Sequence, residues 1–315
     1  MKKAFLFPGQ GSQFVGMGKE LATHFEEAKY VFLEVDEALG EKLSALMFEG
    51  DIEELTLTKN AQPAIMSVSI AILRVMVSHG LDLKAIELFA GHSLGEYSAL
   101  CASGVISLRD TAVILRKRGN AMQKAVPEGK GSMVAVLGLN SENVRDLLIT
   151  SKCDRRLVQV ANDNDPSQVV ISGEKKEVEK FSDFLRQKNA KRIVNLPVSA
   201  PFHSPLMEPA ALKMEEELKT LNFSNPIVPI MHNVDLSVLE ETEGFRDKLV
   251  KQICGTVRWR ESLIKMATGF DVNSFFEIGP GKVLAGTVKR TIPESNVISV
   301  SLATQIDKAL EILNE

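Results

Sequence analysis

The sequence is poor in cysteine and has no excess of positive charge. Its 315 residues include three cysteines, Cys101, Cys153 and Cys254, which lie far apart and form no CxxC pair. A disulfide framework and a zinc cluster are therefore excluded, and the odd number of thiols fits a reducing compartment. The net charge is −4 at pH 7, whereas binding to nucleic acid needs a basic face. We therefore expect no nucleic-acid partner.

The chain also lacks an uninterrupted apolar run long enough to cross a membrane. Its longest apolar stretch, residues 64–77, is interrupted by Ser67, Ser69 and Arg74, and a membrane span requires about 20 apolar residues. The apolar residues near the start end at Pro8, too early for a signal-peptide core. We expect a cytoplasmic protein with no membrane partner. Its content of 44% hydrophobic and 25% charged residues is that of an ordinary globular chain.

The order of apolar runs and turn residues predicts an α/β fold. A short strand over 4–7 leads into a glycine-rich loop, helical spacing follows over 65–76, and another strand is expected over 86–90. A helix over 108–122 ends before Pro127. Further elements are expected at residues 204–221, 227–231, 245–253 and 272–278, with a last helix from 303.

A different pattern occupies the middle of the chain. Strands and helices alternate there as β-α-β-β-α-β, over residues 133–139, 141–150, 157–161, 168–172, 175–189 and 192–197. This is the split βαβ order of ferredoxin-like folds. We therefore predict an α/β-hydrolase-like catalytic domain with a parallel sheet, made discontinuously from residues 1–127 and 201–315, and an inserted ferredoxin-like subdomain of residues 128–200.

The strongest local motif is Gly91-His92-Ser93-Leu94-Gly95, which lies between an apolar strand and a predicted helix. It has the G-x-S-x-G form of a nucleophile elbow, where glycines leave room for a tight turn. The serine then stands at a helix N-terminus, where unpaired backbone N–H groups point outward and can hold an oxyanion. Ser93 is the candidate nucleophile.

A serine hydroxyl needs a neighbouring base to become a strong nucleophile, and the chain contains five histidines. His24 and His79 lie within or at the end of predicted helices, and His92 adjoins the serine on a strained turn. His203, in a loop, and His232, at the end of an apolar strand, remain by context. The residues alone leave a purely structural histidine as an equal alternative for His203.

Five segments together resemble one known family. They are FLFPGQGSQ (5–13), GHSLGEY (91–97), AVPEG (125–129), APFH (200–203) and EIGPGK (277–282). In this order and spacing the chain resembles the malonyl-CoA:acyl carrier protein transacylase family of bacterial type II fatty acid synthesis, over essentially its whole length. The resemblance implies transfer of malonyl from malonyl-CoA to the phosphopantetheine thiol of acyl carrier protein. Ser93 would carry the malonyl group and His203 would be its base, with malonyl-CoA as substrate and no metal or redox cofactor.

The resemblance also implies how the site is completed. The backbone N–H groups of Gln10 and Leu94 would form the oxyanion hole, and a backbone carbonyl at Gln252 would orient the histidine in place of an acid. Both are physically reasonable, since Gln10 follows a strand between two glycines, and the last carbonyls of a helix lack partners within it. Phe202, directly before the histidine, resembles malonyl-preferring members, in which a bulky residue leaves little room for a methyl branch.

Arg118 stands out by helical geometry. Successive residues of a helix are about 100° apart, which places Arg118 near the apolar face of its helix, whereas Lys117 points away. An arginine there needs an anion, and its planar fork suits a carboxylate. The resemblance supplies the free carboxylate of malonyl. An arginine extending past the edge of the core is an equal alternative from sequence alone.

Other interpretations remain at this stage. The GQG turn is no dinucleotide fingerprint, because Phe14 stands where a third glycine is needed. A serine hydrolase or thioesterase would use the same elbow and histidine, and a non-catalytic acyl-carrier-binding module would keep the fold.

Some polar residues are given no role in the site. Asn162 and Asn164 lie between two predicted strands, where asparagines that form a turn are more typical than asparagines that line a cleft. Three basic segments are candidates for contact with the carrier protein, but no docking residue is assigned: 116–117, 188–192 and 289–290.

Overall fold

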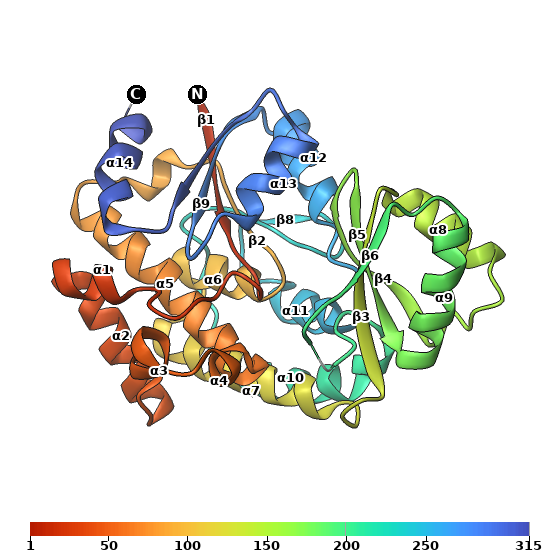
Figure 1. The fold of residues 1–315 in the computed structure, drawn as a ribbon. Coiled ribbons are helices and arrows are strands. Elements are labelled where there is room, and N and C mark those ends of the chain that lie inside the picture. The colour runs from red at the N-terminus through yellow and green to blue at the C-terminus, as the bar shows by residue number, and fades with distance from the viewer. Residues whose placement is uncertain (199, 315) are drawn as a thin grey trace.

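The computed structural model describes residues 1–198 and 200–314, and in these a six-stranded sheet forms the centre of the larger part of the molecule (Figure 1). The strand order is β10-β9-β1-β2-β7-β8, and all neighbours run parallel except β7 and β8. The strands are β1 (Lys2–Phe7), β2 (Leu88–Gly91), β7 (Ile230–Met231), β8 (Val238–Leu239), β9 (Val272–Ile278) and β10 (Asn296–Val300). The predicted α/β class with a parallel sheet is confirmed.

Helices cover both faces of this sheet. They are α1 (Lys19–His24), α2 (Glu26–Leu39), α3 (Leu43–Glu49), α4 (Ile52–Thr56), α5 (Thr58–Ser78), α6 (Leu94–Ala102), α7 (Leu108–Lys124), α10 (Glu208–Lys219), α11 (Phe245–Cys254), α12 (Trp259–Gly269), α13 (Val283–Thr291) and α14 (Ile306–Asn314). Short 3-10 turns lie at Leu83–Ala85, Pro205–Met207 and Ala303–Gln305. Side chains alternate across a strand, so Phe5 and Phe7 face the larger core with α2 and α5, whereas Ala4 and Leu6 pack with residues of α12 and α13.

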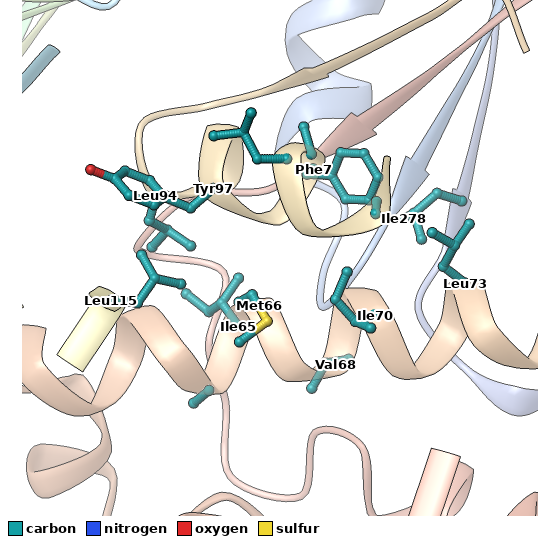
Figure 2. Close-up of a cluster of buried hydrophobic side chains, with 14 of the residues drawn as sticks. Phe7, Ile65, Met66, Val68, Ile70, Leu73, Leu94, Tyr97, Leu115 and Ile278 are labelled. Carbon is teal, nitrogen blue, oxygen red and sulfur yellow. The ribbon is translucent and has the colours of Figure 1, made fainter. Parts of the chain in front are cut away.

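The long apolar helix α5 lies in the larger core. It is long and apolar enough to cross a membrane, but 83% of its most apolar window is buried inside the molecule. Figure 2 shows Ile65, Met66 and Ile70 of this helix directed toward Phe7 and Tyr97. The helix is therefore part of the protein core.

A second, four-stranded antiparallel sheet lies at one side of the molecule, green in Figure 1. Its strands are β3 (Gly131–Leu137), β4 (Val158–Asp165), β5 (Gln168–Glu174) and β6 (Arg192–Asn195), with helices α8 (Ser141–Thr150) and α9 (Lys175–Gln187). The spatial order β4-β5-β3-β6 is the one that a ferredoxin-like β-α-β-β-α-β unit adopts. The predicted order of elements is confirmed, whereas the division of the chain at 127/128 and 200/201 stays a prediction.

Strand β4 joins the two parts. Ala161 and Asp163 exchange backbone hydrogen bonds with Val257, at 2.8 and 2.9 Å, just before α12 begins. The Gln159 side chain donates to the carbonyl oxygens of His203 and Cys254, at 2.6 and 2.8 Å. These bonds hold β4, an outer strand of the smaller sheet, against the segments around His203 and Val257 of the larger part.

Candidate active site

Ser93 lies on a strained turn between β2 and α6. Its backbone has φ 54° and ψ −106°, which is uncommon for a residue with a side chain. A Cβ atom on Gly91 would lie 1.9 Å from the carbonyl carbon of Gly95, and one on Gly95 would lie 2.1 Å from the Phe7 carbonyl oxygen. The two glycines are needed for the tight turn, as the motif predicted.

The structure brings Ser93 and His203 together. Ser93 Oγ is 2.8 Å from His203 Nε2, and His203 Nδ1 is 2.8 Å from the backbone oxygen of Gln252. Because a carbonyl oxygen only accepts hydrogen bonds, Nδ1 carries the proton and Nε2 is left to accept from the serine hydroxyl. His232, the other histidine that remained by context, is fully buried and pairs instead with Glu96.

His203 sits in surroundings that favour its neutral form. The residue is 3% exposed, and burial, followed by the positive charge of Arg118, lowers the pKa of His203 to about 3. Hydrogen bonding to the Gln252 carbonyl acts in the opposite direction. The imidazole is therefore uncharged at neutral pH and available to take a proton.

Arg118 faces inward from α7 and is 1% exposed. Its Nη1 donates to Gln62 Oε1 at 2.9 Å, and its Nη2 donates to Gln252 Oε1 at 2.8 Å and to Ser93 Oγ at 3.2 Å. The guanidinium also lies over the ring of Tyr97, 5.3 Å from its centroid. The hydrogen-bond partners of its two Nη atoms are thus neutral oxygens, and burial lowers the pKa of Arg118, so the guanidinium could bind a carboxylate that enters the site.

A cavity of about 160 Å³ adjoins these groups. Gln10 and Leu94 both line it, because the loops after the parallel neighbours β1 and β2 meet at the same sheet edge. Leu94 begins α6, so its N–H has no partner within the helix. The lining comprises Gln10, Gly11, Gln13, Thr56, Gln62, His92, Ser93, Leu94, Arg118, Met122, Met133, Asn162, Leu196, Pro197, Val198, Phe202 and His203. Among residues 1–198 and 200–314, no cluster of three or more His, Cys, Asp or Glu side chains is placed to hold a metal ion.

The expectation of turn asparagines is wrong. Asn162 and Asn164 lie inside β4, whose pairing with β5 is irregular there. Asn162 lines the cavity, and Asn164 Oδ1 is 2.8 Å from His92 Nε2. Irregular pairing lets a strand direct polar side chains toward a site, and no local sequence signal distinguishes such a strand from a turn.

Sequence reasoning missed several polar residues around the site. Gln62 accepts from Arg118, and Asn233 Oδ1 accepts from the backbone N–H of Ser93 at 2.8 Å. Glu96 is buried behind the serine. A signal existed for one of them, since Glu96 lies in the serine motif itself.

Comparisons with known proteins find similarity over essentially the whole chain. Residues 4–311 match the acyl transferase domain family. The chain is 47% identical to the malonyl CoA-acyl carrier protein transacylase of Bacillus subtilis (strain 168), over 100% of this chain and 98% of that protein. The crystal structure of acyl-carrier-protein-S-malonyltransferase from Bartonella henselae is similar with a TM-score of 0.96 and 50% identity, covering 100% of both chains. A malonyl-transacylase solved in complex with a type II polyketide synthase acyl carrier protein has a TM-score of 0.94 and 40% identity, covering 99% of this chain and 100% of that one.

Proposed function

Because this chain belongs to the malonyl-CoA:acyl carrier protein transacylase family, we infer that it transfers a malonyl group from malonyl-CoA to acyl carrier protein for fatty acid synthesis. It is an [acyl-carrier-protein] S-malonyltransferase, and malonyl-CoA and acyl carrier protein are its partners. The observation that carries the assignment of residues is the position of Ser93 Oγ, 2.8 Å from His203 Nε2 and 3.2 Å from Arg118 Nη2. One methylene separates the reacting carbonyl of malonyl from its carboxylate. A cation this close to the nucleophile is therefore within reach of that carboxylate.

In the first half of the reaction, Ser93 is the nucleophile and His203 the base. His203 Nε2 takes the hydroxyl proton while Oγ attacks the thioester carbonyl of malonyl-CoA. The backbone N–H groups of Gln10 and Leu94 hold the oxyanion, and each such donor contributes about 10²- to 10³-fold in rate. The carbon–sulfur bond then breaks, and His203 returns its proton to the departing thiol of coenzyme A.

The second half reverses these steps with another thiol. The phosphopantetheine thiol of acyl carrier protein gives its proton to His203 and attacks the malonyl ester on Ser93. The bond between the acyl carbon and Oγ breaks, and the proton from His203 restores the serine hydroxyl. The neutral carbonyl of Gln252 orients the imidazole but stabilises imidazolium less than a carboxylate would.

Arg118 selects the acyl group in this proposal. It binds the free carboxylate of malonyl in the cavity, where acetyl would leave the buried guanidinium without an anion. Phe202 lines the same cavity and limits the room for a branched acyl chain. A cytoplasmic location, and the division into a catalytic domain of residues 1–127 and 201–315 and a subdomain of 128–200, are further parts of the proposal.

Intact mass measured after brief mixing with malonyl-CoA tests the assignment. We expect a malonyl adduct on the wild type, none on Ser93→Ala, and discharge of the adduct when acyl carrier protein or pantetheine is added. An adduct on Ser93→Ala would overturn the assigned nucleophile. Loss of the adduct mainly to water would instead indicate a hydrolase.

A further inference from the structure

A buried carboxylate lies directly behind the nucleophile and takes no part in the steps above. Glu96, in the first turn of α6, is 1% exposed. Its Oε1 is hydrogen-bonded to His232 Nδ1, and its Oε2 accepts from Gln252 Nε2 at 2.8 Å and from the Asn233 backbone N–H at 3.2 Å. Three donors from separate parts of the chain thus converge on one side chain.

These partners define the protonation of the pair. Oε2 faces two N–H donors, so it carries no proton, and an acceptor-only carboxylate satisfies all three contacts. His232 is fully buried, and its Nε2 has no hydrogen-bond partner among the described residues. A proton on Nδ1 therefore serves Glu96 and avoids burying an unpaired N–H on Nε2.

Glu96 fixes which way the side-chain amide of Gln252 points. The Nε2 group of that amide donates to Glu96 and to the Ser93 backbone oxygen at 2.9 Å, while Oε1 accepts from Arg118 at 2.8 Å. If the amide were flipped, its oxygen would face the oxygens of Glu96 and Ser93, and its N–H group would face the guanidinium of Arg118. The same residue, through its backbone oxygen, orients His203.

Glu96 reaches the elbow by a second route. It accepts from the Asn233 backbone N–H, and the Asn233 side chain accepts from Ser93 N at 2.8 Å and donates to the Gly91 oxygen at 2.7 Å. One asparagine thus holds the backbone on both sides of His92, including the strained Ser93. A strained turn persists only where its surroundings determine it.

We propose that Glu96, together with His232, is a positioning residue for malonyl transfer: its carboxylate holds Gln252 and Asn233, which in turn place Arg118, His203 and the Ser93 turn. This inference rests on the proposed function. Because the Gln252 amide links Glu96 to Arg118, loss of the carboxylate impairs discrimination between malonyl and acetyl as well as rate.

A double-mutant cycle tests this coupling. Glutamine at position 96 must present its oxygen to Gln252 and Asn233, so its amide nitrogen faces His232 and drives the histidine proton to the unpartnered Nε2. We expect Glu96→Gln to lower the rate of malonyl-enzyme formation about 10- to 100-fold. The malonyl-over-acetyl preference should fall about tenfold in Glu96→Gln and in Gln252→Ala, with less than about a threefold further fall in the double variant.

Gln252→Ala is informative because it keeps the backbone oxygen that orients His203 and removes only the amide. Glu277→Gln is the matched control, since Glu277 is another buried carboxylate, whose oxygens accept from the backbone N–H groups of Leu284 and Ala285. It should alter stability and leave the acyl preference unchanged. Should Glu96→Gln fail to fold, Glu96→Asp, which keeps the charge on a shorter side chain, replaces it in the double-mutant cycle with Gln252→Ala.

The outcomes separate the two proposals. No adduct on the wild type would contradict the assigned chemistry itself. A wild-type adduct, combined with an acyl preference that is unchanged in Glu96→Gln or with effects that multiply in the double variant, would overturn only the positioning role.

Discussion

The hydroxyl of Ser93 has two hydrogen-bond neighbours that both favour loss of its proton. Nε2 of His203 accepts its proton, and Nη2 of Arg118 favours the alkoxide that remains. The same cation, however, lowers the pKa of His203 and makes it a weaker base. A bound malonyl carboxylate would neutralise Arg118 and relieve this effect, so the substrate itself would strengthen the base.

The first prediction concerns Arg118→Ala. Removing the guanidinium removes a charge-assisted, two-point contact to the malonyl carboxylate, so kcat/KM for malonyl-CoA should fall by about 10²- to 10³-fold relative to acetyl-CoA. Adduct formation is measured by intact mass with each thioester. Lys117→Ala is the control, because Lys117 lies on the same helix but pairs with Glu217 outside the cavity. A malonyl preference that survives in Arg118→Ala would contradict the assigned role.

The second prediction concerns pH. A histidine acts as a base when neutral, so a lowered pKa moves the acid limb of the rate profile to lower pH. In the free enzyme His203 has a pKa of about 3, so the acid limb of kcat/KM should lie well below pH 6.5, the ordinary value for histidine. With the malonyl carboxylate on Arg118 the pKa rises, and the acid limb at saturating malonyl-CoA should lie at higher pH.

Rapid-quench measurement of malonyl-enzyme formation at limiting and saturating substrate gives both profiles. Acid limbs that coincide near pH 6.5 would show that neither burial nor Arg118 acts on the base. An acid limb at saturating substrate that lies below the limb for kcat/KM would contradict the sign of the substrate effect.

At the scale of elements, the strand β1 and the helix α6 approach so closely that only glycine fits between them. The third prediction is that Gly95→Ala, whose Cβ would lie 2.1 Å from the Phe7 oxygen, lowers the free energy of unfolding by about 2–3 kcal/mol and abolishes adduct formation. Gly269→Ala is the control, since its Cβ would meet only the flexible side chain of Lys265, at 3.7 Å. Urea denaturation measures the free energy of unfolding of both variants. Equal values for Gly95→Ala and Gly269→Ala would disprove the steric argument.

The sequence predicted those elements whose apolar runs or helical spacing are pronounced. The apolar strands at 4–7 and 272–278 lie within β1 and β9, and Arg118 faces inward as helical spacing indicated. Other elements were given no bounds from the sequence, namely the helices between residues 19 and 56 and β10, and the strand expected at 227–231 is only Ile230–Met231. The element expected at 204–221 is divided into a 3-10 turn, Pro205–Met207, and the helix α10, Glu208–Lys219.

The candidate site was harder to predict from local sequence because its parts are distant in the chain. Ser93 and His203 are 110 residues apart, and Gln252 Oε1 lies 134 residues from the Arg118 nitrogen it contacts. The family resemblance named these residues without placing them. Contacts such as Glu96 with His232 depend on tertiary packing, which no spacing rule covers.

At the scale of the whole molecule, the cavity has walls from both sheets. Ser93 and Arg118 come from the larger part, whereas Met133, Asn162 and Leu196 come from the smaller sheet or the chain just after it. The geometry at the serine therefore depends on how firmly β4 is held against α12. Asp163, which is 0% exposed, forms that contact with Arg260, at 2.9 Å between Oδ2 and Nη2.

The fourth prediction is that Arg260→Met weakens this junction. The variant leaves the Asp163 carboxylate buried without its cation, so the free energy of unfolding should fall by about 3–5 kcal/mol, and KM for malonyl-CoA should rise because Asn162 adjoins Asp163. Urea denaturation and adduct kinetics measure the two effects. Arg109→Met is the matched control, because Arg109 pairs with Glu37 at the surface, where a pair contributes about 1 kcal/mol or less.

The pH dependence of this variant identifies the cause. Burial already raises the pKa of Asp163, and the hydrogen bonds from Arg260 oppose that rise. Without Arg260 the folded state binds a proton at Asp163 more readily than the unfolded state does, so the variant's stability relative to the wild type should recover as pH falls toward the raised pKa. A deficit that stays constant with pH would mean that lost packing, rather than an unpaired buried charge, weakens the contact between the two sheets.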